Sequence, residues 1–207
     1  MAVVAAKIYW GAWADVPVRW PTKDERRVPE HWKRFGSRIS PITGSPRLAA
    51  TPPNALANLL YGLAEAEARI AAIAMGMDPD IGMLHVDTPN RSSLACDLQE
   101  PIRPKVDAFI LNWLQTERLR KPDFWENRQG DCRICSPLVI RLSETADTWR
   151  RLVAPVAEHV AQQVWSLIPS ASKRPIATRL TQRIKRGVKG SDVPEVKQNR
   201  PEHVCLG

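Results

Sequence analysis

The 207-residue sequence contains no apolar run that approaches the roughly 20 residues needed to cross a lipid bilayer. Its first residues, MAVVAAKIYWGAW, lack the basic start and the small-residue cleavage site of a secretory signal peptide. Only four cysteines are present, and their irregular spacing does not suggest a disulfide-stabilised secreted domain. We therefore expect a cytoplasmic protein that makes no contact with a membrane.

Strand-like alternation is also missing from the body of the chain, where apolar residues recur at helical spacing. Hydrophobic residues form 43% of the sequence and include eight tryptophans, which is enough for a packed core. The predicted fold class is all-α. We expect an N-terminal helix and a Pro/Arg-rich connector at 1–53, an α-helical core at 54–169 and a basic tail at 170–207.

Three long helices are expected in the core, and prolines within the second and third must kink or bend them. The first follows two prolines, and an asparagine is a good N-cap at that position. The predicted helices run from Asn54, as N-cap, to about Met75; from Ser92 or Ser93 to about Arg120, with kinks at Pro101 and Pro104; and from near Ser143 onward, with a bend at Pro155.

Charge is distributed unevenly along the chain, which has a formal net charge of +8. Residues 170–200 contain nine lysines and arginines but only two acids, whereas 54–169 contain twelve basic and fifteen acidic residues. A basic tail beside a mildly acidic body is typical of proteins that bind polyanions. The alternative is a solvated tail that keeps the protein soluble.

One glutamate lies within an apolar stripe of the first long helix. Residues three or four apart share a helix face, so Glu67 is predicted to point toward the core. A carboxylate there needs a partner, either an arginine or a metal ion. Glu65 projects elsewhere and can pair with Arg69 at the surface. The predicted stripe comprises Leu56, Leu60, Leu63, Glu67, Ile70 and Ala74.

A histidine and two acids follow in the segment HVDTPNRSSLACDLQEPIRP. Asp97 and Glu100 are one helical turn apart, so both can lean toward one point, and His85 precedes them in a loop. Each alone has an ordinary explanation, a packed histidine or a solvated acidic pair. Together with Glu67 they form a set rich in oxygen ligands, which suits Mg²⁺ or Mn²⁺ better than zinc. Such cations bind phosphate oxygens, so the set points to phosphodiester transfer or hydrolysis.

The order and spacing of these residues resemble the catalytic core of the CRISPR-associated endonuclease of the universal spacer-acquisition, or adaptation, family. That family typically reads N-A-L-x-N-x-x-Y-x-x-L-E-A-E, then G-L-D-P-x-x-G-x-L-H, then S-L-x-x-D-L-x-E-x-F-R-P. The match is strong over residues 54–107 and weaker through SETADTWRRLVAPVAEHVA. The matching positions are Asn54, Asn58, Tyr61, Leu63 and Glu67; Asp78, Pro79, Gly82, Leu84 and His85; and Ser93, Leu94, Asp97, Leu98, Glu100, Arg103 and Pro104.

The resemblance implies a divalent-metal site, with Glu67, His85 and Glu100 as ligands of Mg²⁺ or Mn²⁺ and Asp97 as a nearby catalytic acid. It implies that the 3′-hydroxyl of a spacer DNA attacks a phosphodiester in a CRISPR repeat. Arg103 fits a phosphate-facing role, or a structural pair with the nearby acids. In the basic tail, the expected DNA-contacting residues are Lys173, Arg174, Arg179, Arg183, Lys185 and Arg186.

The resemblance also implies partners, since members of the family form a homodimer and a small CRISPR-associated adaptation protein bridges two such dimers. The usual N-terminal β-rich domain that builds the homodimer has no counterpart in this sequence. We therefore expect a truncated member, mainly monomeric, that retains slow metal-dependent nicking without two-ended integration.

Two weaker signals have competing explanations. Cys132 and Cys135 have the spacing of half a zinc site, which His203 and Cys205 would have to complete, or they are an incidental pair. The tryptophans between residues 10 and 32 alternate with basic residues and either stack on nucleic-acid bases or pack against the body.

Three function classes therefore stay open. They are a metal-dependent DNA integrase or endonuclease, a DNA-binding remnant without turnover, and a scaffold of an adaptation complex that uses no metal.

Overall fold

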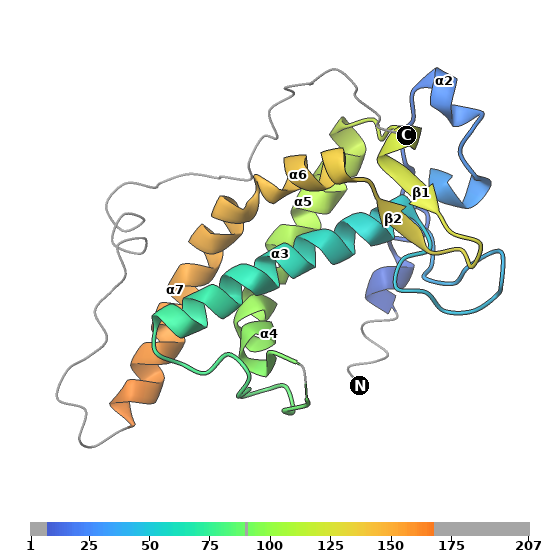
Figure 1. Ribbon diagram of the computed structural model, residues 1–207. Coiled ribbons are helices and arrows are strands. Elements are labelled where there is room, and N and C mark those ends of the chain that lie inside the picture. Colours follow the sequence, from blue (N-terminus) through green and yellow to red (C-terminus); the bar gives the residue numbers. More distant parts are fainter. Residues whose placement is uncertain (1–7, 90, 168–207) are drawn as a thin grey trace.

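The computed structural model describes residues 8–89 and 91–167 (Figure 1). A helical turn at 8–11 precedes a connector with two short elements, and a group of longer helices follows, with a small hairpin at one end. The elements are α2 (Thr22–Glu25), η1 (Glu30–Lys33), α3 (Pro52–Ala74), α4 (Ser93–Gln99), η2 (Glu100–Ile102), α5 (Arg103–Thr116), η3 (Lys121–Asp123), β1 (Phe124–Glu126), β2 (Cys132–Ile134), α6 (Ser136–Ser143) and α7 (Ala146–Ser166).

Helix α3 lies at the centre and contacts α4, α5, α6, α7 and β2. Its N-cap is Thr51, whose side chain accepts a hydrogen bond from the Asn54 backbone N–H. The prediction of Asn54 as N-cap was therefore wrong: two prolines fit the first turn because their missing N–H groups have no helical partner there. Asn54 lies inside that turn, and its Nδ2 donates to the Phe35 carbonyl at 3.4 Å. The predicted end near Met75 is confirmed, with Gly76 in a left-handed conformation after it.

The buried face of α3 differs from the predicted stripe. Leu56, Leu60 and Glu67 are buried, but Ile70 is 57% exposed and Ala74 is also exposed. A column of small residues occupies the buried face instead and lets neighbouring helices approach α3 closely, because alanine adds little beyond the backbone. We call this set the alanine column: Ala57, Ala64, Ala68 and Ala72, all 0% exposed.

The segment after the loop at 77–92 follows the predicted kinked course. Helix α4 begins at Ser93, η2 tightens the chain around Pro101, and α5 continues from Arg103 with Pro104 in its first turn. Helix α5 ends at Thr116, earlier than the predicted Arg120.

The third predicted helix, expected to start near Ser143, is α7, and the shorter helix α6 before it was not predicted. Helix α6 ends at Ser143, and a short turn separates it from α7, which begins at Ala146. Thr145 closes this turn: its Oγ1 donates to the Leu142 carbonyl at 2.6 Å and accepts from Trp149 Nε1 at 2.9 Å. Pro155 lies within α7 as predicted, on an exposed position.

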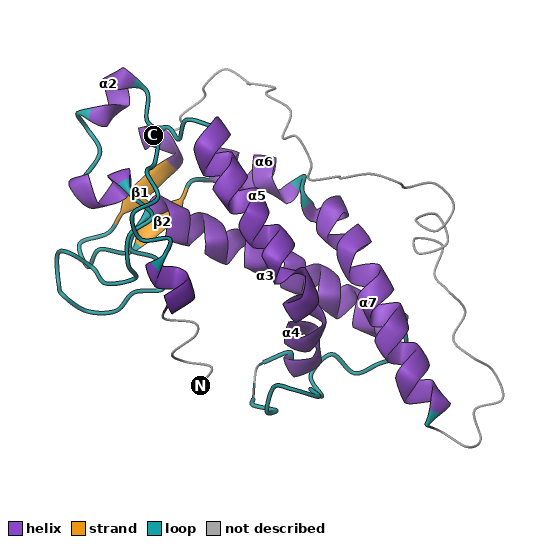
Figure 2. Ribbon diagram, turned by 180° about the vertical axis from the view of Figure 1, so that it is seen from behind, coloured by secondary structure: helices purple, strands orange, loops and turns teal. Residues whose placement is uncertain are grey.

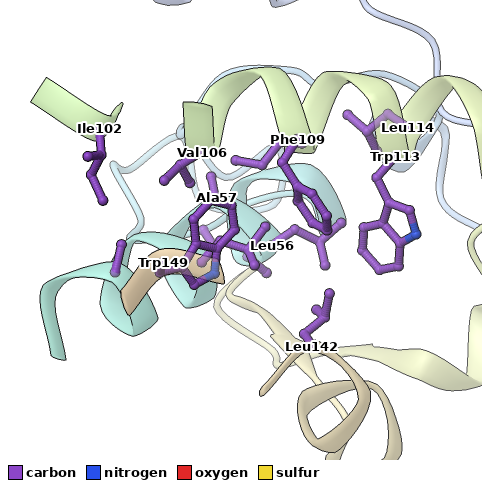
Figure 3. Packing of buried hydrophobic residues seen from close by; sticks show 14 of the residues in the cluster. Leu56, Ala57, Ile102, Val106, Phe109, Trp113, Leu114, Leu142 and Trp149 are labelled. Atoms are coloured by element: carbon purple, nitrogen blue, oxygen red, sulfur yellow. The ribbon is translucent and has the colours of Figure 1, made fainter. Parts of the chain in front are cut away.

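Figure 3 shows how α3, α5, α6 and α7 share one apolar core. Trp149 of α7 meets Phe109 of α5 edge to face, with ring centroids 5.6 Å apart. Residues from all four helices surround this pair, and burial of such side chains is the main source of folding free energy. The labelled core residues are Leu56, Ala57, Ile102, Val106, Phe109, Trp113, Leu114, Leu142 and Trp149.

The all-α expectation was too strict, because β1 and β2 form an antiparallel hairpin at one end of the helices (Figure 2). Phe124 pairs with Ile134 and Glu126 with Cys132 in its register. Each strand has three residues, too few to produce a period-two pattern that the sequence would reveal. The fold is mostly helical with one small sheet.

The connector packs against this hairpin. Trp20, Trp32 and Phe124 form one aromatic cluster, with Trp20 and Trp32 stacked at a centroid distance of 6.2 Å. Trp13 is buried as well, so packing rather than base stacking explains these connector tryptophans. Within the described ranges, no helix has the length and apolar character needed to span a membrane.

Candidate active site

The loop between α3 and α4 is organised around the carboxylate of Asp97. The backbone N–H groups of Met83, Leu84 and His85 donate to its oxygens at 2.5, 2.8 and 3.1 Å. Asp97 lies on α4 and is only 5% exposed. Burial acts to raise the pKa of Asp97, but hydrogen bonds from the Leu84, Met83 and His85 backbones and from the His85 ring hold it below its ordinary value.

His85 is oriented by the same carboxylate. Its Nδ1 lies 2.5 Å from Asp97 Oδ1, while its Nε2 lies 3.9 Å from Glu100 Oε1. A carboxylate that accepts the Nδ1 proton leaves the Nε2 lone pair available, which is the arrangement found behind metal-binding histidines. Asp97 is thus placed to position His85 rather than to face a substrate.

Gly82 allows the loop to fold closely over the start of α4. A Cβ at this position would lie 2.4 Å from the His85 carbonyl oxygen and 2.7 Å from Ser93 Cβ, so no larger residue fits without movement. The Gly82 N–H donates to Asp87 Oδ1 at 2.7 Å, and Ser92 Oγ donates to Asp80 Oδ1 at 2.9 Å. The loop therefore has several anchors besides Asp97.

Glu100 begins η2 and is partly exposed, with its Oε1 facing both His85 and Arg103. Arg103 Nη1 donates to that oxygen at 2.8 Å, and its guanidinium lies 5.0 Å from the centre of the Tyr61 ring. The Tyr61 hydroxyl in turn donates to the buried Asp107. This chain of contacts fixes Arg103 beside the candidate ligands, where it neutralises part of their negative charge.

Glu67 is paired with an arginine. Arg150 of α7 donates from Nε to Oε2 of Glu67 at 2.9 Å and from Nη2 to Oε1 at 3.2 Å. Hydrogen bonds and attraction from Glu67 raise the pKa of Arg150 above its ordinary value. Of the two partners predicted for this buried glutamate, the structure shows the arginine.

These side chains fit a divalent cation only in part. His85 Nε2 and Glu100 Oε1 converge at 3.9 Å, compatible with two ligands of one ion, since neighbouring ligands of octahedral Mg²⁺ are about 3 Å apart and opposite ligands about 4 Å. Over residues 8–89 and 91–167, however, no group of three or more His, Cys, Asp or Glu side chains is arranged to hold a metal. The third predicted ligand, Glu67, is paired with Arg150 instead.

The remaining predicted site residues are divided between described and undescribed regions. Arg103 forms a structural ion pair with Glu100, which is one of the two roles predicted for it. Cys132 is buried, and burial raises the pKa of its thiol, while His203 and Cys205 lie outside the described residues. The six predicted DNA contacts of the tail also lie outside them: Lys173, Arg174, Arg179, Arg183, Lys185 and Arg186.

Arg150 and Asp107 escaped the sequence analysis although both shape the site. Arg150 is 83 residues from Glu67, and the stretch TWRRL looks like an ordinary charged helix face. The buried glutamate was the only available signal, because it required a cation without specifying where in the chain that cation lies.

A family model described as CRISPR associated protein Cas1 matches residues 4–138. The chain is 37% identical over 130 residues to the CRISPR-associated endonuclease Cas1 1 of Archaeoglobus fulgidus, which covers 63% of this chain and 34% of that protein. It is 45% identical over 74 residues to the CRISPR-associated endonuclease Cas1 2 of Rhodospirillum rubrum, covering 35% of this chain and 22% of that protein. The chain thus spans about a third or less of the length of these relatives.

A solved structure has a similar fold. It is a chain titled "Casposase bound to integration product", with a TM-score of 0.53 and 23% sequence identity. The superposition covers 66% of this chain and 45% of the casposase chain. At this identity the likeness concerns the fold alone.

Proposed function

Because the chain belongs to the Cas1 family of CRISPR-associated proteins, we propose that it carries the catalytic domain of a divalent-metal-dependent DNA endonuclease and integrase of spacer acquisition. One observation carries the proposal: Asp97 orients His85 so that its Nε2 faces Glu100 Oε1 at 3.9 Å. The helical core at 54–169 supplies these groups, and the basic tail at 170–207 supplies contacts to DNA.

Within this proposal each side chain has a separate task. Asp97 holds the Nδ1 proton of His85, so Nε2 is free to bind a metal ion beside Glu100. Glu67 would be the third ligand, and Arg150, which binds its carboxylate in this structure, would then have to release it. Bound Mg²⁺ or Mn²⁺ supplies stabilisation of the charge on the attacking and leaving oxygens of a phosphodiester. Arg103, fixed beside Glu100, is placed to bind a phosphate oxygen.

The substrates and partners follow from the family. We propose that the 3′-hydroxyl of a spacer precursor attacks a phosphodiester of the CRISPR repeat. The relatives named as CRISPR-associated endonucleases support a reaction at a phosphodiester. We also propose that the complete assembly contains a homodimer bridged to another by a small CRISPR-associated adaptation protein.

Binding of Mn²⁺ tests the site directly. A ligand that binds only the folded state raises the melting temperature, so Mn²⁺ is expected to stabilise wild type in a concentration-dependent way. His85→Ala should abolish most of that shift, whereas His159→Ala, on an exposed position of α7, should keep it. Equal shifts in wild type and His85→Ala would count against this site.

Turnover requires a second measurement. With Mn²⁺ and branched or single-stranded DNA, wild type should nick slowly, and Glu100→Gln should reduce the rate by at least a hundredfold, because a metal ligand is lost. Cleavage that persists in EDTA would contradict a metal-dependent reaction.

A catalytically inactive DNA-binding protein is the second candidate. The pairing of Glu67 with Arg150 favours it, because a carboxylate satisfied by arginine needs no metal. DNA binding in EDTA, together with neither Mn²⁺ stabilisation nor nicking, would establish this candidate instead.

A further inference from the structure

Trp125 differs from the other tryptophans of this protein. All eight lie in the described residues, and Trp125 is the only one classed as exposed, with 50% of its surface accessible. It takes part in no aromatic pair and in no contact with a cation within those residues, and it does not pack against the apolar core. Its ring is therefore open to contact by a ligand.

The position of Trp125 in the hairpin explains its exposure. Phe124 before it is buried against the connector, so alternation along β1 turns Trp125 to the opposite face of the sheet. Arg133 is its cross-strand partner and is also exposed, so the two side chains lie on the same face of the hairpin. We call this face, with Arg128 of the connecting turn, the hairpin platform.

The charge of the hairpin platform is positive. The two acids of the hairpin, Glu126 and Asp131, both have partners in the connector: His31 Nε2 lies 2.8 Å from Glu126, and Arg47 Nε lies 3.9 Å from Asp131. Arg128 and Arg133 make no ion pair with any acid of the described residues. Their charges are therefore available to an anionic ligand.

The turn that supports the hairpin platform is rigid. Asn127 Oδ1 accepts from the backbone N–H groups of Gln129 and Asp131, both at 2.9 Å. Gly130 has a φ of +80°, and a Cβ there would lie 2.0 Å from Ser40 Oγ, so the turn is locked against the connector. A hairpin backbone held in this way loses little conformational entropy when a ligand binds to it.

We propose that the hairpin platform binds single-stranded nucleic acid, with an unpaired base stacked on Trp125 and the adjoining phosphates bound by Arg133 and Arg128. Bases inside a duplex are already stacked on their neighbours, so an exposed ring gains most from an unpaired or displaced base. The two unpaired guanidinium groups favour a polyanion over an uncharged partner. The inference rests on the proposed function, because it adds a single-strand contact to a protein proposed to act on DNA. The binding step itself requires no metal.

Fluorescence anisotropy of labelled oligothymidylate, measured in EDTA, tests this proposal apart from the catalytic one. Trp125→Ala should weaken single-strand binding about five- to a hundredfold, the range found when a stacked base loses its aromatic partner. Trp125→Phe should retain most of the affinity, while Trp125→Leu, which keeps an apolar side chain, should lose it. Binding to duplex DNA should change by less than about twofold in all three.

The matched controls lie elsewhere on the surface. Ile140→Ala removes an exposed apolar side chain of α6 and should leave binding unchanged. Arg133→Ala and Arg128→Ala should each reduce the salt slope of single-strand binding by about 0.7, while Arg69→Ala on α3 should not.

Three results would overturn the proposal. They are a Trp125→Ala variant that binds the single strand as tightly as Ile140→Ala, an equal loss on duplex DNA, and a change in oligomeric state with single-strand affinity unchanged. These measurements are made without metal, so a negative result would not count against the Mn²⁺ site at His85 and Glu100. A negative result for the Mn²⁺ site would likewise not count against single-strand binding.

Discussion

Arg150 of α7 binds both carboxylate oxygens of Glu67 on α3, at 2.9 and 3.2 Å. The pair joins two helices that are far apart in sequence, and it satisfies a glutamate whose side chain is 8% exposed. Glu67 is also the one side chain of α3 that the family resemblance assigns as a metal ligand, and Arg150 occupies its carboxylate. The same contact therefore stabilises the fold and competes with the proposed ion.

Removing Arg150 separates these two effects. Arg150→Met should destabilise the protein by about 1–3 kcal/mol, because Glu67 is left buried without its partner. Arg151→Met should cost under about 1 kcal/mol, since within residues 8–89 and 91–167 the ion-pair partner of Arg151 is the exposed Asp147 alone. Urea denaturation measures both changes.

The double variant Glu67→Met/Arg150→Met should recover most of the loss, because no unpaired charge remains. In the proposed metal site, Mn²⁺ should stabilise Arg150→Met more than wild type. A smaller Mn²⁺ shift in Arg150→Met would contradict competition between the arginine and the ion.

Asp97 is expected to control the order of the His85 loop. Asp97→Asn keeps the shape of the side chain but loses the anion that accepts three backbone N–H groups and the His85 ring. We expect a loss of about 1.5–3 kcal/mol, the range for hydrogen bonds to charged groups. NMR of the His85 ring should show averaging between orientations.

Asp87→Asn is the matched control for that loss, because Asp87 accepts the single N–H of Gly82 and is exposed. A cost in Asp97→Asn no larger than in Asp87→Asn would show that the loop is held mainly by other contacts.

The alanine column predicts a sharp difference between neighbouring positions of α3. Ala68→Leu should destabilise by about 1–3 kcal/mol, because extra methylene groups in a packed core force side chains or helices apart. Ala66→Leu, two residues earlier on an exposed position, should change stability by less than about 0.5 kcal/mol. Thermal melting of the two variants provides the comparison, and similar melting temperatures would refute close packing at Ala68.

Asp123 lowers the free energy of unfolding by an amount that depends on pH. Burial raises the pKa of its carboxyl above the ordinary value, although Arg141 and Arg120 oppose the rise. The folded state therefore binds a proton more tightly than the unfolded state, so this residue favours folding at low pH and opposes it above its folded pKa. Asp123→Asn should stabilise the protein at neutral pH, and the gain should fade as the pH falls through that pKa. A gain that persists at low pH would point to another cause.

The sequence predicted α3, the kinked segment of α4 and α5, and α7 well because each has strong local signals, whereas α6 was not predicted. Prolines, an apolar period and Gly76 placed the ends of α3 and the kink between α4 and α5 within a few residues. The face of α3 was harder, because hydrophobicity favoured Ile70 while close packing favoured small residues such as Ala68. The hairpin was missed because its three-residue strands are defined by long-range partners rather than by their own pattern.

The candidate site was predictable only as a set of side chains. The motif brought out Glu67, His85, Asp97 and Glu100, and the structure places the last three together. It could not reveal that Asp97 binds backbone groups or that Arg150 binds Glu67, since both depend on contacts between distant elements. The roles of the individual residues are therefore a property of tertiary packing.

The alanine column also makes the part of the candidate site that carries Glu67 open less often than the loop that carries His85. Glu67 and Arg150 stand on helices in direct contact, so the backbone segments that carry them separate only when the core breaks, although the Arg150 side chain, 47% exposed, can leave the carboxylate in the folded state. His85 stands on a loop whose order depends on hydrogen bonds at its edge, and such loops open far more often than the core. On warming, the histidine side should begin to fluctuate while the glutamate side is still fixed. Heat would then disable the site well before the protein itself unfolds.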